Sequence, residues 1–230
     1  MKALLHITPR PTAGAAFGDA IATAAAAIRR SPAADAVLVT ALLRVSNDPL
    51  GAKTPFGATI EIAGEAADLA TFDALLADTG KRLEAVAIVA DSALLIGDDV
   101  VSMESEGAPV RYQYLMRRRP DYDHAAYLKR YREVHYEFGL RTPGIAGYAQ
   151  FHVDLVASRA AAEKFGFGVW DFDSVSQLHL ESLEKFFAAV SESQVPREAM
   201  ADEERFVDRA NSFDFISHVE IRGDAVGISP

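Results

Sequence analysis

The chain contains no cysteine among its 230 residues. This absence excludes disulfide bonds, thiolate nucleophiles and cysteine-based metal or redox sites. A reducing cytoplasm is therefore the location that we expect for the protein. No apolar run approaches the roughly 20 residues that a membrane-spanning helix needs. The opening residues 1–7 meet His6 and then Arg10 too early for a secretory signal peptide.

Positive charge is also scarce. Lysine and arginine number 23 against 33 aspartate and glutamate residues, which gives a formal net charge of -10. Phosphate binding needs clustered cations, so this balance argues against nucleic acid and anionic membranes as partners. The one basic run is Arg117-Arg118-Arg119. Such a run at a strand end is more often a solvated edge than an anion site, and the sequence leaves both open.

Several signatures of metal and cofactor sites are missing. The segment Gly166-Phe167-Gly168 lacks the rest of a dinucleotide-binding loop, and no nucleophile elbow is present. No histidine pair has zinc spacing. The cluster at residues 121–124 contains two aspartates and a histidine, but a turn followed by an N-terminal helix cap accounts for it. We therefore predict no metal and no organic cofactor.

Aromatic residues are nearly absent from the first half of the chain. Of the 13 Phe, 7 Tyr and 1 Trp, only Phe17, Phe56 and Phe72 precede position 108, and five of the six histidines follow it. The second half therefore holds the groups that stack on a small molecule or exchange protons with it. We place any functional site there.

The two halves nevertheless repeat one order of elements. The length suits two units of about 110 residues, and the likeliest hinge is residues 104–109. Both halves are predicted to run strand, helix, strand, strand, helix, strand. In the first half these elements are expected at residues 3–7, 15–30, 36–44, 58–62, 68–82 and 85–90. In the second half they are expected at residues 110–116, 123–138, 145–153, 168–172, 175–190 and 213–221, with an inserted helix at 200–210.

This βαββαβ order is the ferredoxin-like arrangement, in which both helices cover one face of a four-stranded antiparallel sheet. Strands such as residues 112–116 carry large side chains on both faces, so the second face also needs cover. Two sheets that face one another provide it. We therefore predict an α+β protein built from tandem ferredoxin-like repeats that pack as an α+β barrel within one chain. Residues 1–107 would form a degenerate structural repeat, and residues 108–230 would carry the pocket.

The predicted helix at residues 123–138 is the most informative segment. Tyr127, Tyr131 and His135 follow one another at intervals of four, so they share one face. Charged residues occupy the opposite face, which places His135 on the buried side among aromatic rings. One interpretation is a core histidine with a satisfied ring nitrogen. The other is a general acid or base in a pocket of low dielectric constant.

Other residues are weaker candidates. Tyr114 and Tyr148 lie on predicted strands, and either ring is suited to contact a ligand. His152 and His218 share strand faces with polar residues, and each is a pocket candidate or a residue of the barrel interface or surface. Trp170 is either a core residue or a ring that stacks on a ligand.

Three segments together resemble the EthD family of dimeric α/β-barrel proteins. They are Arg117 to Pro120, then Asp123-His124-Ala125-Ala126-Tyr127 through His135, then Pro143-Gly144-Ile145-Ala146-Gly147-Tyr148. The later segments at residues 170–174 and 202–208 are similar to that family as well. The resemblance covers residues 110–221, and it implies that His135 and Tyr148 correspond to the family's recurrent histidine and tyrosine. The chain departs from the family at His135-Tyr136-Glu137, where Ala-Pro or Gly-Pro often follows the histidine, and at Tyr131, where tryptophan is common.

The resemblance implies a class of function rather than one reaction. EthD-like proteins are associated with the breakdown of ethers and other hydrophobic compounds, and barrel relatives include cofactor-free monooxygenases, isomerases and lyases. The first hypothesis is thus a small cofactor-independent enzyme that acts on a hydrophobic or aromatic metabolite. His135 would be the catalytic residue, and the substrate-binding residues would be Tyr127, Tyr131, Tyr148, Trp170, Tyr114 and His152. The alternative is a non-catalytic ligand-binding or stress-related barrel. A homodimer is compatible with either hypothesis.

Overall fold

The computed structural model describes residues 1–35, 37–105 and 107–221. Over these residues, eight strands close into one antiparallel barrel in the order β1-β3-β2-β8-β5-β7-β6-β4. The strands are β1 (Lys2–Ile7), β2 (Leu38–Arg44), β3 (Ala58–Ala63), β4 (Ala93–Met103), β5 (Val110–Met116), β6 (Gly147–Val153), β7 (Ser174–Leu180) and β8 (Phe213–Ile221). The helices are α1 (Ala16–Arg29), α2 (Leu69–Leu76), α3 (Thr79–Leu83), α4 (His124–Arg130), α5 (Tyr136–Arg141), α6 (Leu155–Phe165), α7 (Leu183–Ser191) and α8 (Val195–Glu203). The predicted strand residue Ala36, the hinge residue Glu106 and the end of the second unit, residues 222–230, lie outside the described residues.

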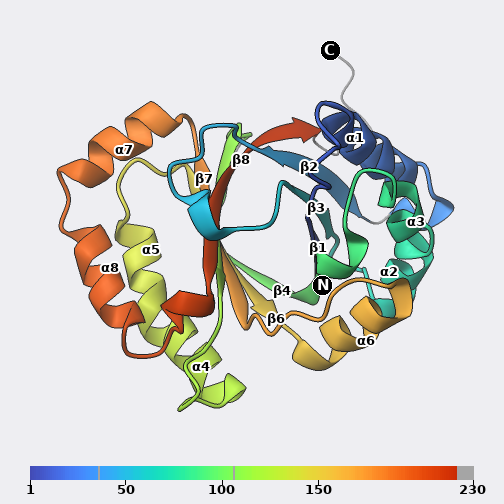
Figure 1. The fold of residues 1–230 in the computed structure, drawn as a ribbon. Coiled ribbons are helices and arrows are strands. Elements are labelled where there is room, and N and C mark those ends of the chain that lie inside the picture. Colours follow the sequence, from blue (N-terminus) through green and yellow to red (C-terminus); the bar gives the residue numbers. More distant parts are fainter. Residues whose placement is uncertain (36, 106, 222–230) are drawn as a thin grey trace.

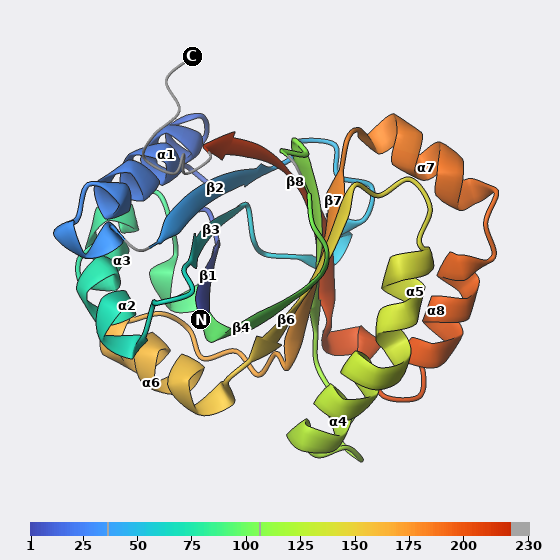
Figure 2. The ribbon, with the colours of Figure 1, turned by 180° about the vertical axis from the view of Figure 1, so that it is seen from behind.

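The helices form two layers on opposite sides of the barrel (Figures 1 and 2). Helices α1, α2, α3 and α6 cover one side, and α4, α5, α7 and α8 cover the other. Helix α6 follows β6 in the chain, yet its Ala161 and Ala162 join the same buried cluster as Ile21 and Leu76 of the first half. The second half therefore supplies part of the layer that covers the first.

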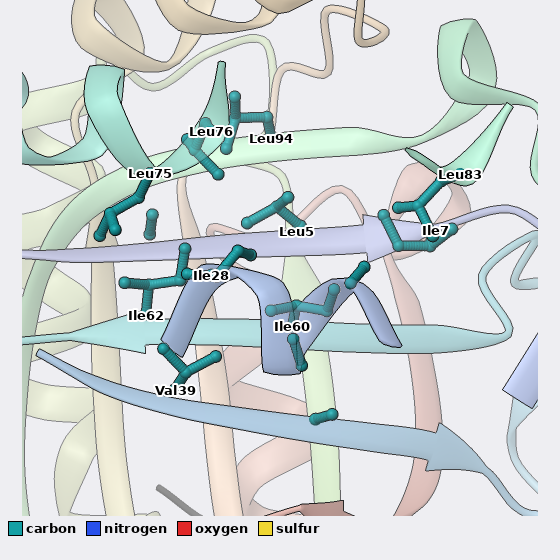
Figure 3. Packing of buried hydrophobic residues seen from close by; sticks show 14 of the residues in the cluster. Leu5, Ile7, Ile28, Val39, Ile60, Ile62, Leu75, Leu76, Leu83 and Leu94 are labelled. Carbon is teal, nitrogen blue, oxygen red and sulfur yellow. The ribbon is translucent and has the colours of Figure 1, made fainter. Parts of the chain in front are cut away.

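Strand β1 shows why both faces of the sheet are filled. Leu5 and Ile7 contact the α1 side (Figure 3), where they belong to the larger apolar core. The alternate residues Lys2, Leu4 and His6 point into the barrel, because successive side chains on a strand face opposite ways. All six residues of β1 are buried. Each fully buried leucine or isoleucine contributes about 1.5–3 kcal/mol through removal of apolar surface from water.

Two pairings join the halves into a closed barrel. Strand β2 pairs with β8, where Leu42 lies opposite Val219, and β4 pairs with β6, where Val101 lies opposite Ala149. A closed barrel leaves no strand edge open for association with another chain. In each half the strands also follow the same relative order, β4-β1-β3-β2 and β8-β5-β7-β6.

The barrel interior has an apolar part and a polar part. Leu4, Phe56, Phe151 and Phe215 are among the buried residues of the apolar part, which draws on both halves. The polar part is a set of charged and amide side chains from four strands. They are Lys2, Glu61, Arg111 and Gln177, and each is less than 10 % exposed.

The prediction of a strand at residues 85–90 was wrong. Residues 85 and 86 form a turn, because the backbone N–H groups of Val86 and Ala87 both bond to the carbonyl of Leu83 at the end of α3. Ala87 then makes a single β-bridge to Pro9, and residues 89–91 form a 3-10 helix. The strand begins later, as β4. Its first residues Ala93 to Ile96 are buried on both faces, and the strand continues to Met103.

The predicted strand at residues 168–172 and the helix from residue 175 were also wrong. Residues 174–180 form strand β7, because Val175, Gln177 and His179 alternate with the residues that face the helices. The cap of α7 is Ser182, whose hydroxyl accepts a bond from the backbone N–H of Lys185.

Three helices differ in extent from the prediction. The expected helix at 68–82 is divided into α2 and α3, and the inserted helix lies earlier, as α8. Helix α6 was not predicted; Asp154 caps its N-terminus and Gly166 ends it with a φ of 75°, a conformation that favours glycine. The third helix that differs in extent is the one predicted at residues 123–138. A π-helical turn, Tyr131–His135, divides it into α4 and α5.

Candidate functional site

A cavity of about 680 Å³ lies between the outer face of the second-half sheet and the helices that cover it. Strands β5, β6, β7 and β8 provide its floor, and α5, α7 and α8 provide its walls. Its lining is mostly aromatic and aliphatic, with a few acidic and hydroxyl groups. The lining includes Tyr112, Tyr114, His135, Phe138, Tyr148, Ser176, Leu178, Phe186, Phe187, Met200, Glu203, Arg209 and Asp214. Cavities of this size and composition are typical of sites for small hydrophobic molecules.

The π-helical turn delivers His135 to this cavity. The backbone N–H of Tyr136 bonds to the carbonyl of Tyr131, five residues earlier, in place of the usual four. Such single π turns are rare and occur frequently at functional sites. Tyr127, Tyr131 and His135 remain on the buried face, as the sequence spacing predicted.

The imidazole of His135 is held by an acidic side chain on α8. Its Nδ1 lies 3.1 Å from Oδ2 of Asp202, and Arg130 pairs with the other carboxylate oxygen of Asp202. A carboxylate only accepts hydrogen bonds, so Nδ1 carries the hydrogen and donates it. The lone pair is then on Nε2, which lies 3.9 Å from Oε1 of Glu203. This arrangement leaves Nε2 as a proton acceptor beside the cavity.

Burial lowers the pKa of His135, because the charged ring loses hydration. The hydrogen bond and the charge of Asp202 oppose this effect, and the Arg130 guanidinium adds to it. The result is a ring that favours the neutral state and is ready to accept a proton.

The pKa values of the acidic groups in the cavity are raised, whereas that of His135 is lowered. Burial raises the pKa of Glu203 to about 7, with Arg209 opposing and Asp214 and Asp202 contributing. Burial also raises the pKa of Asp214. The phenols of Tyr112 and Tyr114 on β5 stay protonated, since burial raises both pKa values. The cavity thus combines neutral hydrogen-bond donors with a neutral base.

The predicted tyrosines occupy two layers. Tyr114 and Tyr148 line the cavity, and burial raises the pKa of Tyr148 to about 12. Tyr127 and Tyr131 are fully buried. Tyr131 stacks between Tyr127 and His135, with ring centroids 6.0 Å and 5.9 Å apart. Tyr131 therefore supports His135 from the side, and Tyr127 supports Tyr131.

The three remaining candidates, His152, His218 and Trp170, are not part of the cavity lining, and His218 is exposed on β8. His152 meets the edge of the Tyr131 ring, and its Nε2 lies 3.1 Å from Oε1 of Gln150. Trp170 stacks on Phe172 at 5.4 Å and meets Phe56 at 5.2 Å, at the apolar part of the barrel. Its surroundings are those of a core residue.

Sequence reasoning missed the acidic groups of the site. Asp202, Glu203 and Asp214 were not among the candidate residues, although residues 202–208 belonged to the segments that resemble the EthD family. Asp202 lies 67 positions from His135 in the chain. The resemblance was the one signal that connected these two segments.

The first half also contributes to the cavity, which the sequence had assigned to the second half. Leu50, Ala52 and Lys53, from the loop between β2 and β3, are part of its lining. Asp48 fixes this loop on β8: its carboxylate accepts bonds from the backbone N–H groups of Leu50 and Ile216, at 3.0 Å and 3.1 Å. The first half is therefore a wall of the cavity as well as part of the barrel.

We expect Asp48→Ala to lower the free energy of unfolding by about 2–4 kcal/mol. The Asp48 carboxylate is 1 % exposed and also accepts from Nε of Arg44 at 2.9 Å, so its removal leaves three donors without this partner. Urea unfolding followed by circular dichroism measures the change. Asp48→Asn is the control, because it keeps one acceptor oxygen and should cost less. A loss below about 0.5 kcal/mol for Asp48→Ala would contradict the anchoring role.

His124, the histidine of the cluster at residues 121–124, has a structural role. Its Nδ1 lies 2.7 Å from Oδ1 of Asp173, and its Nε2 lies 3.0 Å from the carbonyl oxygen of Val153. These contacts tie the start of α4 to the ends of two strands. The neighbouring arginines are paired as well: Arg118 with Asp173, and Arg119 with Asp121 at 2.9 Å. The basic run is therefore a set of ion pairs at the strand end.

Two further findings concern ions and membranes. Within residues 1–35, 37–105 and 107–221, no group of three or more His, Asp or Glu side chains is placed to hold a metal ion. Across the same residues, no helix has the length and apolarity needed to cross a membrane.

The family model of the EthD domain matches residues 119–210. The resemblance drawn from the sequence motifs is thereby confirmed for this part of the second half. The matched region contains the π-helical turn, His135, Tyr148 and both Asp202 and Glu203. Among curated proteins, none matches the chain.

Several solved structures share the fold along nearly the whole chain. An anthrone oxidase-like protein is 12% identical with a TM-score of 0.65, over 98% of this chain and 93% of that protein. A putative monooxygenase from Lactobacillus acidophilus NCFM is 9% identical with a TM-score of 0.56, over 99% and 97%. Chlorite dismutase from Candidatus Nitrospira defluvii, in complex with imidazole, is 13% identical with a TM-score of 0.56, over 96% and 90%. At such identities the likeness shows the fold.

Proposed function

We propose that the protein is an enzyme that binds a hydrophobic, aromatic small molecule in the cavity and uses His135 as a general acid and base. One observation carries the proposal: Nε2 of His135 stands beside an aromatic cavity while Asp202 fixes the opposite ring nitrogen. The opening of the cavity onto His135 favours a role of this residue in ligand chemistry over that of a histidine in a packed core.

The chemistry assigned to His135 is proton transfer. Nε2 takes a proton from an acidic O–H or C–H of the ligand, and the ring becomes an imidazolium. The Asp202 carboxylate stabilises that cation, since its hydrogen bond and charge favour the protonated ring. The same proton then returns to the ligand or to its product. No bound metal or organic cofactor takes part in this step.

The surrounding residues orient the ligand and exclude water. The phenol of Tyr148, protonated at neutral pH, donates a hydrogen bond to a ligand oxygen, and Tyr114 provides a second phenol. Tyr127 and Tyr131 hold the imidazole plane by stacking. Phe138, Phe186 and Phe187 supply the apolar wall.

The reaction class is proposed from the relatives. The EthD match and the names of the similar structures, a putative monooxygenase and an anthrone oxidase-like protein, support oxidation of the ligand, with dioxygen as the oxidant: one oxygen atom enters the ligand as a carbonyl, and the other leaves as water with the two hydrogens removed from that carbon. A lyase or isomerase reaction uses the same proton transfer and is the second chemistry that the site suits.

The proposal extends to the architecture and the setting of the protein. We infer that residues 1–107 and 108–230 are tandem ferredoxin-like repeats, and the equivalent strand orders of the two halves support this. We also propose a cytoplasmic location and no nucleic-acid or membrane partner. A homodimer would associate through helices, since the described barrel is closed.

His135→Gln tests the catalytic role. Glutamine keeps approximate size and polarity but cannot carry a proton through the cycle. We expect the variant to fold and to retain aromatic ligands while turnover falls by about 10²–10⁴-fold. Turnover is measured as loss of substrate by mass spectrometry, with hits from a panel of aromatic compounds. His218→Gln, at an exposed histidine on β8, is the control and should be fully active. A normal rate for His135→Gln would leave His135 as a structural residue only.

A further inference from the structure

Glu203 is the acidic group that faces the proposed base. It ends helix α8 and lines the cavity, and its side chain is 11 % exposed. Its Oε1 lies 3.9 Å from Nε2 of His135, and its Oε2 lies 3.4 Å from Nε of Arg209. A single ligand atom at the wall of the cavity can therefore contact both the imidazole and the carboxyl group.

We propose that His135 and Glu203 form a subsite for a hydroxyl group on an otherwise apolar aromatic ligand. The hydroxyl donates its hydrogen to Nε2 of His135, and its oxygen accepts the hydrogen of the protonated Glu203 carboxyl. This inference rests on the proposed function and names the ligand chemistry of the same site.

The choice of a hydroxyl follows from what each partner offers. Nε2 accepts and does not donate, because Nδ1 carries the ring hydrogen. A protonated carboxyl group donates. Only a group that both donates and accepts satisfies the two partners with one atom, and a hydroxyl does so. An ether or ketone oxygen accepts only, and it would leave Nε2 unsatisfied in a buried site, which costs affinity.

The charges around Glu203 decide when the carboxyl group holds its proton. Arg209 faces it from the turn after α8, Asp214 from β8, Tyr112 and Tyr114 from β5, and His135 and Asp202 from the helix layer. Burial is the largest influence and raises the pKa of Glu203 to about 7, against the effect of Arg209. The donor is therefore present below neutral pH and lost above it.

The experiment compares two neutral probes, 2-naphthol and its methyl ether 2-methoxynaphthalene, by calorimetry at pH 6 and pH 8. A phenolic hydroxyl with a pKa of about 10 stays protonated in this range. We expect the Kd of 2-naphthol to rise about tenfold from pH 6 to pH 8, as Glu203 loses its proton. At pH 6 the Kd of the methyl ether should be about tenfold higher than that of 2-naphthol, since the ether oxygen accepts from Glu203 but leaves Nε2 of His135 without a donor.

Two variants test whether Glu203 causes the pH dependence of 2-naphthol binding. Glu203→Gln keeps a neutral donor at every pH, so its affinity for 2-naphthol should be nearly equal at pH 6 and pH 8. Glu204→Gln, at the exposed glutamate next to Glu203 and outside the lining of the cavity, should keep the wild-type pH dependence. NMR signals of the His135 ring report that the probe occupies this cavity. Circular dichroism establishes that each variant is folded.

The outcomes separate this inference from the proposed function. A shift of the His135 signals by 2-naphthol with no pH dependence would overturn the role of Glu203 and leave the ligand site in place. A pH dependence that persists in Glu203→Gln would do the same. Failure of both probes to affect His135 would contradict the ligand site itself. If Glu203→Gln does not fold, the comparison of the two probes on the wild-type protein still tests whether the subsite prefers a hydroxyl group.

Discussion

Replacement of Glu61 with alanine is expected to lower the free energy of unfolding by about 3–5 kcal/mol, the largest effect that we predict. Glu61 lies on β3 inside the barrel with its side chain 7 % exposed. It pairs with Lys2 at 3.9 Å and Arg111 at 3.6 Å, and it accepts a bond from the amide of Gln177. Without it, Lys2 retains Asp99 at 2.9 Å, but the buried Arg111 guanidinium loses its carboxylate.

The same cluster links the two halves of the chain. Lys2 and Glu61 belong to the first half, whereas Arg111 and Gln177 belong to the second. Burial would raise the pKa of Glu61, but the charges of Lys2 and Arg111 overcome it and lower the pKa to about 2. The carboxylate therefore stays ionised, and its loss leaves positive charge uncompensated in the interior.

Urea unfolding measures the Glu61→Ala effect. The control is Glu65→Ala, at an exposed glutamate just after β3, which should change the free energy of unfolding by less than about 0.5 kcal/mol. A loss below about 1 kcal/mol for Glu61→Ala would show that the cluster contributes little to holding the halves together.

The second large effect is a loss of stability in acid caused by His6. Its ring is fully buried in the barrel, its Nδ1 lies 3.0 Å from Oγ1 of Thr59, and the rings of Phe56 and Phe215 contact it. Burial lowers the pKa of His6 from 6.5 to about 3; Glu61 opposes this and Lys2 adds to it. The ring is thus neutral in the folded protein at neutral pH.

The sign of the pH dependence follows from linkage. The unfolded chain binds a proton at His6 below about pH 6.5, whereas the folded chain does so only near pH 3. The free energy of unfolding therefore falls as the pH drops below 6.5. The contribution of His6 to this loss is about 3 kcal/mol at pH 4. Part of the total acid sensitivity comes from carboxylates such as Glu61, so the contribution of His6 is the difference between wild type and a variant.

His6→Leu isolates that difference. The variant removes the titrating ring, and Thr59 keeps its bond from Nε2 of Gln113 at 3.0 Å. The slope of unfolding free energy against pH between 6.5 and 4 should become shallower than in wild type. His218→Leu, at the exposed histidine of β8, is the control and should keep the wild-type slope. Equal slopes for His6→Leu and wild type would show that His6 is not the acid-sensitive group.

The sequence predicted features that depend on local periodicity. The strands β1 and β8 are predicted within one residue of their observed bounds, and the spacing of Tyr127, Tyr131 and His135 identified a shared buried face. The sequence predicts a helix from residue 175 because Leu178 and Leu180 of β7 lie just before the apolar residues of α7. Together they resemble the apolar pattern of one continuous helix. The π-helical turn keeps these side chains on one face, so the spacing carries no sign of it.

Features that depend on distant pairs were not predictable. Lys2, Glu61 and Arg111 carry charges that usually face solvent, and their burial is stable only because residues from different strands meet inside the barrel. The partner of His135 is Asp202, from another helix, and the anchor of the β2–β3 loop is the backbone of β8. None of these pairs leaves a pattern in neighbouring residues.

A crystal structure of the protein grown with 2-naphthol tests the central claim most directly, because that claim is the location of the ligand site. We expect planar density in the cavity between the second-half sheet and helices α5, α7 and α8, in contact with His135. Density confined to the barrel interior or to the outer surface, with this cavity unoccupied by the probe, would contradict it.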